Sequence, residues 1–191
     1  MEPRKFLDFL EILEKLKCNT RHSWTSSGRR ESVAEHSYRL MAMAFLLKKE
    51  FPETDMNRVL EMCLVHDWGE AVTGDIPSFY KTGDDESKEE QAVNCLLKQL
   101  PPDTAKRISA LFDEVREQKT EEAKIFAALD KLEAVIQHNE ADISTWLPLE
   151  RELNPIYGEE QAEPIPYLRE VRRLAKEDSL QKVREDENQQ S

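Results

Sequence analysis

A chain of 191 residues is long enough for one domain with a well-buried core. Its net charge of −12 argues against partners that are nucleic acid polymers or anionic membranes. The longest apolar run, residues 40–47, covers eight residues, far below the ~20 that a membrane span needs.

The predicted elements are helices, because glycines number only five, 35 % of the residues are charged and β-branched runs are few. Apolar residues recur at helical spacing in residues 4–17, and a Ser-, Thr- and Gly-rich loop follows. Ser32-x-x-Glu35 has the pattern of a capping box and predicts a helix of about 18 residues that ends near Pro52.

The later elements are also predicted to be helices, separated by turn signals. One runs from Asp55 to Gly74, and the next follows a polar turn at 82–90 and ends at Leu100. Two more begin at Pro101 and at Thr120, and the last covers about 166–180. Residues 140–163 are expected to be irregular. We therefore predict one all-α domain over residues 1–180, its site-bearing core at about 30–140, followed by a disordered tail at 181–191.

The charge is unevenly distributed along this acidic chain. Residues 1–50 carry 10 Lys and Arg against 7 Asp and Glu, and residues 18–30 hold three Arg and no acid. This loop is a candidate site for a small anion, and a solvated basic loop is the alternative.

The three cysteines show no C-x-x-C spacing, which argues against a disulfide framework and favours the reducing cytoplasm.

Three core-type helices each carry an imidazole or carboxylate within an apolar stretch. These residues are His36, the pair His66-Asp67, and Asp130. A single helical His is usually a satisfied core or surface residue, and a single Asp is usually a cap or ion-pair partner. Together they form a set of two nitrogens and two carboxylates that suits Mn, Fe, Co, Ni or Zn, and two carboxylates neutralise a divalent cation. We therefore predict one divalent transition metal.

The order of these residues, within "ESVAEHS", "VHDWGE" and "TGDIP", resembles the HD-domain metal-dependent phosphohydrolases. More narrowly, residues 5–140 resemble their 5′-deoxynucleotidases, the YfbR type and its eukaryotic relatives. The resemblance implies a helical HD-domain bundle with its metal among the central helices. It implies that His36, His66, Asp67 and Asp130 bind this metal, and that Glu70 activates or orients the attacking water.

The resemblance also implies how a nucleotide is bound. Arg21 takes the place of the phosphate-orienting arginine, helped by Arg29 or Arg30, and Trp24 is the candidate for stacking on the base. The deoxyribose is expected to contact a turn that consists of Asp75, Ile76, Pro77 and Ser78. Some relatives hold a second ion, such as Mg, with the equivalents of Glu70, Asp75 and the Ile76 carbonyl. The YfbR type has Trp directly after its arginine, where this chain has His22.

The expected activity is therefore release of phosphate from deoxyribonucleoside 5′-monophosphates. The alternatives are hydrolysis of another nucleotide phosphoester, or a non-catalytic HD module that binds a ligand. Dinuclear HD phosphodiesterases and di-iron oxygenases usually add two His before the last Asp, and residues 68–129 contain none. His138 lies near a helix end, where a solvated or capping role is expected. An apolar helix pair in the C-terminal third favours a homodimer.

Overall fold

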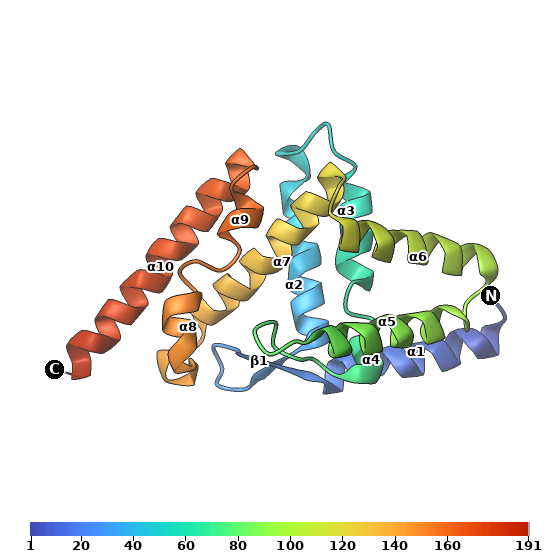
Figure 1. Ribbon diagram of the computed structural model, residues 1–191, viewed down its shortest axis with the longest axis horizontal. Helices are drawn as coiled ribbons and strands as arrows, with labels where there is room; N and C mark the ends of the chain where they lie inside the picture. The colour runs from blue at the N-terminus through green and yellow to red at the C-terminus, as the bar shows by residue number, and fades with distance from the viewer. Residues whose placement is uncertain (191) are drawn as a thin grey trace.

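Residues 1–190 are described by a computed structural model in which nearly all regular structure is helical (Figure 1). The α-helices are α1 (Pro3–Cys18), α2 (Val33–Leu46), α3 (Met56–Val65), α4 (Glu70–Thr73), α5 (Gly83–Leu97), α6 (Pro102–Glu117), α7 (Glu121–Glu140), α8 (Pro148–Leu153), α9 (Glu159–Ala162) and α10 (Pro166–Gln190). Short 3₁₀ helices cover Leu47–Lys49 and Ile143–Thr145, and strands cover Thr20–Trp24 (β1) and Arg30–Ser32 (β2). The predicted all-α fold is confirmed. None of the described helices combines the length and apolar character that crossing a bilayer requires.

Helix α7 forms the centre of the core, packed against α2, α3 and α10 (Figure 1). Its residues 125–129 are all buried, and Leu132 and Val135 on the following turns are buried as well. A helix that is apolar nearly all round needs neighbours on every side. This arrangement places the polar residues of α7 inside the molecule, where each needs a partner.

The predicted capping box opens α2 as expected. The Ser32 side chain accepts a hydrogen bond from the Glu35 amide, and the Glu35 carboxylate accepts one from the Ser32 amide. The cap satisfies two amide groups that the helix itself leaves unpaired. It thereby fixes where α2 starts, and with it the position of His36 one turn later.

The loop predicted before this cap contains an antiparallel hairpin of β1 and β2. Thr20 pairs with Ser32 and Trp24 with Arg30, and the connecting turn contains Gly28 with a φ of +79°. The strands are short and mostly polar, so they lack the apolar alternation by which a strand is predicted. The hairpin contacts α7, and Gln137 on that helix donates to the Trp24 carbonyl over 2.6 Å.

Residues 55–74 form two helices rather than the single helix predicted. Helix α3 ends at Val65, and α4 begins only at Glu70. Between them the Trp68 amide donates to the Val65 carbonyl and the Glu70 amide to the Asp67 carbonyl, three residues back in each case. This tighter winding continues the backbone hydrogen bonding while ending the regular α-helix.

The C-terminal region is more ordered than predicted. The irregular stretch contains the short helices α8 and α9, and α10 continues to Gln190 instead of ending at 180. Arg151 on α8 donates to Asp186 over 2.6 Å, and Ser179 donates to the Asn139 side chain over 2.7 Å. These contacts tie α10 to α7 and α8, which accounts for the longer helix.

Candidate active site

The imidazole of His36 is held through both of its nitrogens inside the bundle. The side chain is fully buried, and its Nδ1–H donates to the Glu133 carboxylate on α7. Its Nε2 faces Asp130 Oδ1 at 3.1 Å. Burial and Arg21 lower the pKa of His36, but its hydrogen bonds to Asp130 and Glu133 outweigh them and raise it to about 9. The carboxylates favour a positive charge here, which a proton or a divalent cation supplies.

His66 and Asp67 contribute one more nitrogen and one more carboxylate to the same point. The Nδ1–H of His66 donates to the Cys63 carbonyl over 3.0 Å, which leaves the lone pair on Nε2. This Nε2 lies 3.4 Å from His36 Nε2 and 3.0 Å from Asp67 Oδ2. Burial raises the pKa of Asp67, but His66 outweighs it and lowers the value to about 2. Asp67 is therefore ionised at neutral pH.

The four predicted metal ligands are brought together by α2, the end of α3 and α7. His36 Nε2 lies 3.9 Å from Asp67 Oδ2, and His66 Nε2 lies 3.9 Å from Asp130 Oδ1. Ligand atoms that share a metal at about 2.1 Å lie roughly 3.0–3.5 Å apart when adjacent. His36, His66 and Asp67 offer ligand atoms within 4.8 Å of one another, and Asp130 Oδ1 lies 3.1 Å from His36 Nε2. A metal shared by all four residues therefore requires side-chain shifts.

Glu70 and Asp75 place two further carboxylates beside Asp67. Burial raises the pKa of Glu70, and Asp67 and Asp75 raise it further, to about 10. Gly74, with a φ of +76°, forms the turn between them, a conformation that residues with a Cβ rarely adopt. Asp67 Oδ2, Glu70 Oε2 and Asp75 Oδ2 are buried without a hydrogen bond in the described structure. Such oxygens are costly unless a cation satisfies them.

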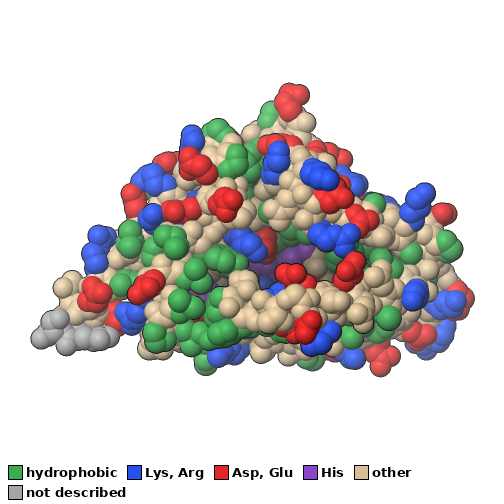
Figure 2. All heavy atoms as spheres, in the orientation of Figure 1, with side chains coloured by type: hydrophobic (Ala, Val, Ile, Leu, Met, Phe, Trp, Pro, Cys, Tyr) green, Lys and Arg blue, Asp and Glu red, His purple; other side chains and the backbone are tan. Residues whose placement is uncertain are grey.

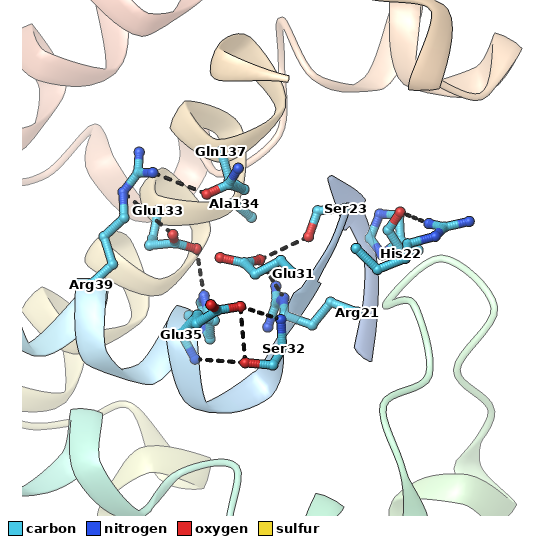
Figure 3. A network of polar contacts seen from close by, with 12 residues as sticks. Arg21, His22, Ser23, Glu31, Ser32, Glu35, Arg39, Glu133, Ala134 and Gln137 are labelled. Carbon is cyan, nitrogen blue, oxygen red and sulfur yellow. Dashed lines mark hydrogen bonds and ion pairs between the residues drawn. The ribbon is translucent and has the colours of Figure 1, made fainter. Parts of the chain in front are cut away.

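Arg21 on β1 lies beside Glu31 (Figure 3) and also approaches the carboxylate of Asp67. Its Nε lies 3.3 Å from Glu31 Oε2, and Nη1 lies 3.8 Å from Asp67 Oδ2. Ser23 donates to Glu31 over 2.8 Å and so holds that carboxylate in place. Burial lowers the pKa of Arg21, but Asp67, Glu133 and Glu31 outweigh it and keep the pKa above its ordinary value. The site thus contains a permanent, mostly buried cation suited to bind a phosphate.

A cavity of about 290 Å³ connects these groups, close to the lower limit of about 300 Å³ for small-molecule sites. Figure 2 shows histidine atoms at the bottom of a hollow on this face, with acidic and basic side chains around it. The residues predicted for the site that line the cavity are Arg21, His66, Asp67, Glu70, Asp75, Ile76, Pro77, Ser78 and Asp130. His36 lies directly behind this wall, against Asp130.

Trp24 and Arg29 are not brought to the cavity in the part of the chain that the structure describes. The Arg30 guanidinium covers the Trp24 ring, 4.6 Å from its centroid, and Arg29 pairs with the half-buried Glu35. Both side chains lie near the far end of the hairpin. The cavity wall contains other rings, those of Phe79 and Tyr157, that a base could contact.

Sequence reasoning missed two residues that support the predicted ligands. Glu133 is fully buried and orients His36, and Lys131 lies 2.9 Å from Asp130 Oδ2. Asp130 raises the pKa of Lys131 above its ordinary value, although burial opposes this. The available signal was Glu133 itself, a charged residue within an apolar helix and three positions after Asp130, on the same face.

The expectation that His138 is solvated or a cap is wrong. His138 is 8 % exposed and lies on the cavity wall with His22 and Glu150, which sequence reasoning also left out. Burial raises the pKa of Glu150, but hydrogen bonds to His138 and His22 outweigh it and hold the pKa well below its ordinary range. The sequence signal was weak, since these residues lie on three separate elements.

Known proteins share both the sequence pattern and the fold. The family model described as HD domain matches residues 13–172. The human 5′-deoxynucleotidase HDDC2 is 33 % identical over 141 residues, which cover 72 % of this chain and 68 % of that protein. The protein of the same name from Dictyostelium discoideum is 34 % identical over 142 residues, 69 % of this chain and 75 % of its own.

Solved structures resemble this chain in fold as well. A crystal structure described as a predicted metal-dependent phosphohydrolase, from Magnetospirillum magnetotacticum, has a TM-score of 0.78 and 30 % identity, with 94 % of this chain and 95 % of that chain covered. An HD-domain phosphohydrolase from Listeria innocua, 22 % identical, shares the fold with a TM-score of 0.64 and coverage of 95 % and 88 %. The family model spans most of the chain and includes every residue of the cavity wall described above. The chain therefore belongs to the HD-domain family.

Proposed function

We propose that this protein is a metal-dependent 5′-deoxynucleotidase, which releases phosphate from deoxyribonucleoside 5′-monophosphates. The observation that carries the proposal is one cavity in which a cluster of imidazoles and carboxylates faces a buried guanidinium. The first group suits a cation and Arg21 suits a phosphate, so together they suit a phosphoester. The curated HDDC2 relatives that bear the name 5′-deoxynucleotidase support the choice of substrate.

In this proposal His36, His66, Asp67 and Asp130 hold one divalent transition metal. When bound, the metal lowers the pKa of a coordinated water to about 7 and polarises a phosphoryl oxygen. Glu133 holds the His36 ring so that Nε2 points inward, as carboxylates beside metal-binding histidines commonly do. The set discriminates poorly among Mn, Fe, Co, Ni and Zn, because each accepts imidazole and carboxylate ligands.

Glu70 is the residue proposed to accept a proton from the attacking water. Its apolar surroundings and the carboxylates of Asp67 and Asp75 give it a high proton affinity. Positive charge beside Asp67 lowers that affinity toward the range in which a carboxylate acts as a base at neutral pH. Glu70, Asp75 and the Ile76 carbonyl are also the proposed ligands of a second ion, such as Mg.

Arg21 is proposed to clamp the phosphate, so we expect its loss to affect every substrate alike. Arg21→Ala should lower kcat/KM by about 10²-fold for all deoxynucleotides, because charge on the phosphate is then unpaired in the transition state. Arg21→Lys keeps the charge but loses the planar pair of donors, so it should recover only part of the loss. Initial rates of phosphate release measure both effects, with thermal melting to verify folding.

The matched control for Arg21 is Arg173→Ala on the outer surface of α10. Arg173 pairs with Glu170 and Glu177 at the surface, away from the cavity wall. Its substitution should leave kcat/KM unchanged. A wild-type rate in Arg21→Ala would remove Arg21 from the phosphate site.

Selectivity for the deoxyribose tests the proposed function directly. The turn at Gly74 carries residues 75–78 along the cavity wall. In this proposal the turn leaves too little room for a ribose 2′-hydroxyl to form a hydrogen bond in place of its lost water. This loss costs roughly 1–3 kcal/mol, or about a ten- to hundredfold preference for deoxyribonucleotides. We expect that ratio between dAMP and AMP in kcat/KM, with weak discrimination among bases.

Phosphate release from a panel of ribo- and deoxyribonucleoside mono-, di- and triphosphates, measured with Mn, Co, Ni or Mg, distinguishes the alternative functions. Equal rates on dAMP and AMP would leave a general HD phosphohydrolase, and faster hydrolysis of another phosphoester would identify that substrate. Binding without turnover under every metal would indicate a ligand-binding module.

The proposal also includes a cytoplasmic homodimer. Cys18, Cys63 and Cys95 are free thiols, which suits a reducing compartment. Exposed apolar side chains on α10, Tyr167, Leu174 and Leu180 among them, support the expected self-association. Light scattering on the purified chain measures its mass in solution.

A further inference from the structure

A second cluster of potential metal ligands lies on the wall of the same cavity. It consists of His22 on β1, His138 near the end of α7 and Glu150 on α8. His22 Nε2 lies 3.0 Å from Glu150 Oε1, and His138 Nε2 lies 3.1 Å from the same oxygen. Two imidazole nitrogens and one carboxylate oxygen thus converge from three elements that are distant in sequence.

The contact of Nδ1 shows which ring nitrogen of His138 carries the proton. Nδ1 lies 2.9 Å from the Ala134 carbonyl, which has no hydrogen to give, so Nδ1 must carry the proton. In neutral imidazole the Nε2 lone pair then points at the Glu150 carboxylate. Two acceptors at 3.1 Å repel each other unless a second proton or a metal ion lies at that point.

This arrangement repeats what the structure shows for His66 in the HD site. There too, Nδ1–H donates to a backbone carbonyl of the same helix, and Nε2 faces a carboxylate at 3.0 Å. A backbone carbonyl on the second ring nitrogen is one of the common ways in which proteins orient metal-binding histidines. The cluster at His138 therefore has the supporting contacts of a metal site, not only its ligands.

Glu150 is oriented as firmly as His138. Its Oε2 accepts a hydrogen bond from the Leu147 amide over 2.6 Å, which leaves Oε1 for the two imidazoles. Glu150 is 4 % exposed, so its charge is not neutralised by solvent. His22 has an exposed fraction of 21 % in its side chain and packs edge-on against Phe79, with ring centroids 5.3 Å apart. All three residues line the cavity, and the side chain of His22 is the most exposed of them.

We propose that His22, His138 and Glu150 form a further divalent metal site, separate from the HD set and from the position proposed for Mg at Glu70 and Asp75, with its open coordination position toward the cavity. Two imidazoles and one carboxylate with a fourth open position are a ligand set that zinc takes in enzymes. The ion would add positive charge to a wall that carries six carboxylates against three Lys and Arg, within the cavity proposed to bind an anionic nucleotide. The site itself depends only on the cluster, not on the proposed activity.

Metal stoichiometry tests the site without using activity. Wild type, Asp67→Ala, His22→Gln and the double variant are stripped with a chelator, reloaded with Co²⁺ and dialysed, and the metal per chain is measured by mass spectrometry. We expect about two equivalents in the wild type, one in each single variant and none in the double variant. His22→Cys in the Asp67→Ala background should restore the equivalent, with a Co²⁺ absorption spectrum that shows thiolate ligation.

Other results would overturn the site. One such result is that Asp67→Ala retains no metal, and another is that adding His22→Gln to Asp67→Ala leaves its metal content unchanged. In either case His22, His138 and Glu150 form a protonated, hydrogen-bonded contact between β1, α7 and α8, not a metal site. Circular dichroism verifies that each variant is folded. His22 is partly exposed, so His22→Gln is not expected to unfold the protein.

Discussion

Asp67→Ala will remove one equivalent of bound transition metal and lower phosphate release by about 10³-fold or more. Asp67 is one of the two carboxylates proposed for the HD site, and its Oδ2 lies 3.0 Å from His66 Nε2 and 3.9 Å from His36 Nε2. Removing it also takes away the negative charge that balances a divalent ion. Metal per chain and rates on dAMP, measured on the same preparation, give both effects.

Two controls separate loss of the metal from loss of the fold. Asp113→Ala removes an exposed carboxylate that pairs with Arg116 on α6, so it should change neither quantity. Asp67→Asn keeps the shape of the side chain and removes its charge, and we expect it to bind metal more weakly than the wild type. Full metal content and full activity in Asp67→Ala would refute the ligand assignment.

The sequence singles out the four residues proposed for the HD site, because a charged or polar side chain within an apolar helix is costly to bury without a partner. Asp130 stands between apolar residues 125–129 and Leu132, and such a carboxylate needs a specific partner. Together with His36 and the pair His66-Asp67, it allows few chemical interpretations. The structure places His36, His66 and Asp67 within 4.8 Å of one another, with Asp130 Oδ1 3.1 Å from His36 Nε2, and their role as metal ligands stays a prediction.

The path of the backbone between these residues could not be predicted to the same extent. The turn after Val65 contains no proline, and its Gly69 is followed by good helix formers, so a continuous helix is the natural prediction. A close approach by α5 explains that glycine, because a Cβ at Gly69 would lie 2.8 Å from the Glu89 side chain. Contacts of this kind come from tertiary packing and leave no local pattern.

The hairpin and the second cluster were missed for a related reason. Strands of five and three mostly polar residues carry no periodic signal, although β1 places Arg21 and His22 on the cavity wall. His138 near a helix end is ordinary on its own. Only the fold shows that Glu150, twelve residues later, returns to meet it.

Glu70→Gln will leave the metal content unchanged and lower kcat by about 10²-fold or more. The amide has nearly the same size as the carboxylate and can still accept hydrogen bonds, but it does not take up a proton at neutral pH. The variant also removes a buried group whose charge is opposed by Asp67 and Asp75, so the metal-free protein should lose no stability. Single-turnover rates and thermal melting test these two effects.

Glu90→Gln on the exposed surface of α5 is the matched control and should keep the wild-type rate. The pair of measurements also decides between the two roles proposed for Glu70. A base is needed for proton transfer alone, so Glu70→Gln would keep its KM and its bound transition metal while kcat falls. If Glu70 instead binds a second ion, the rate should depend on added Mg, and the activation constant for Mg should rise in Glu70→Gln. Unchanged kcat would show that the carboxylate of Glu70 takes no part in activating the water, whatever its raised pKa.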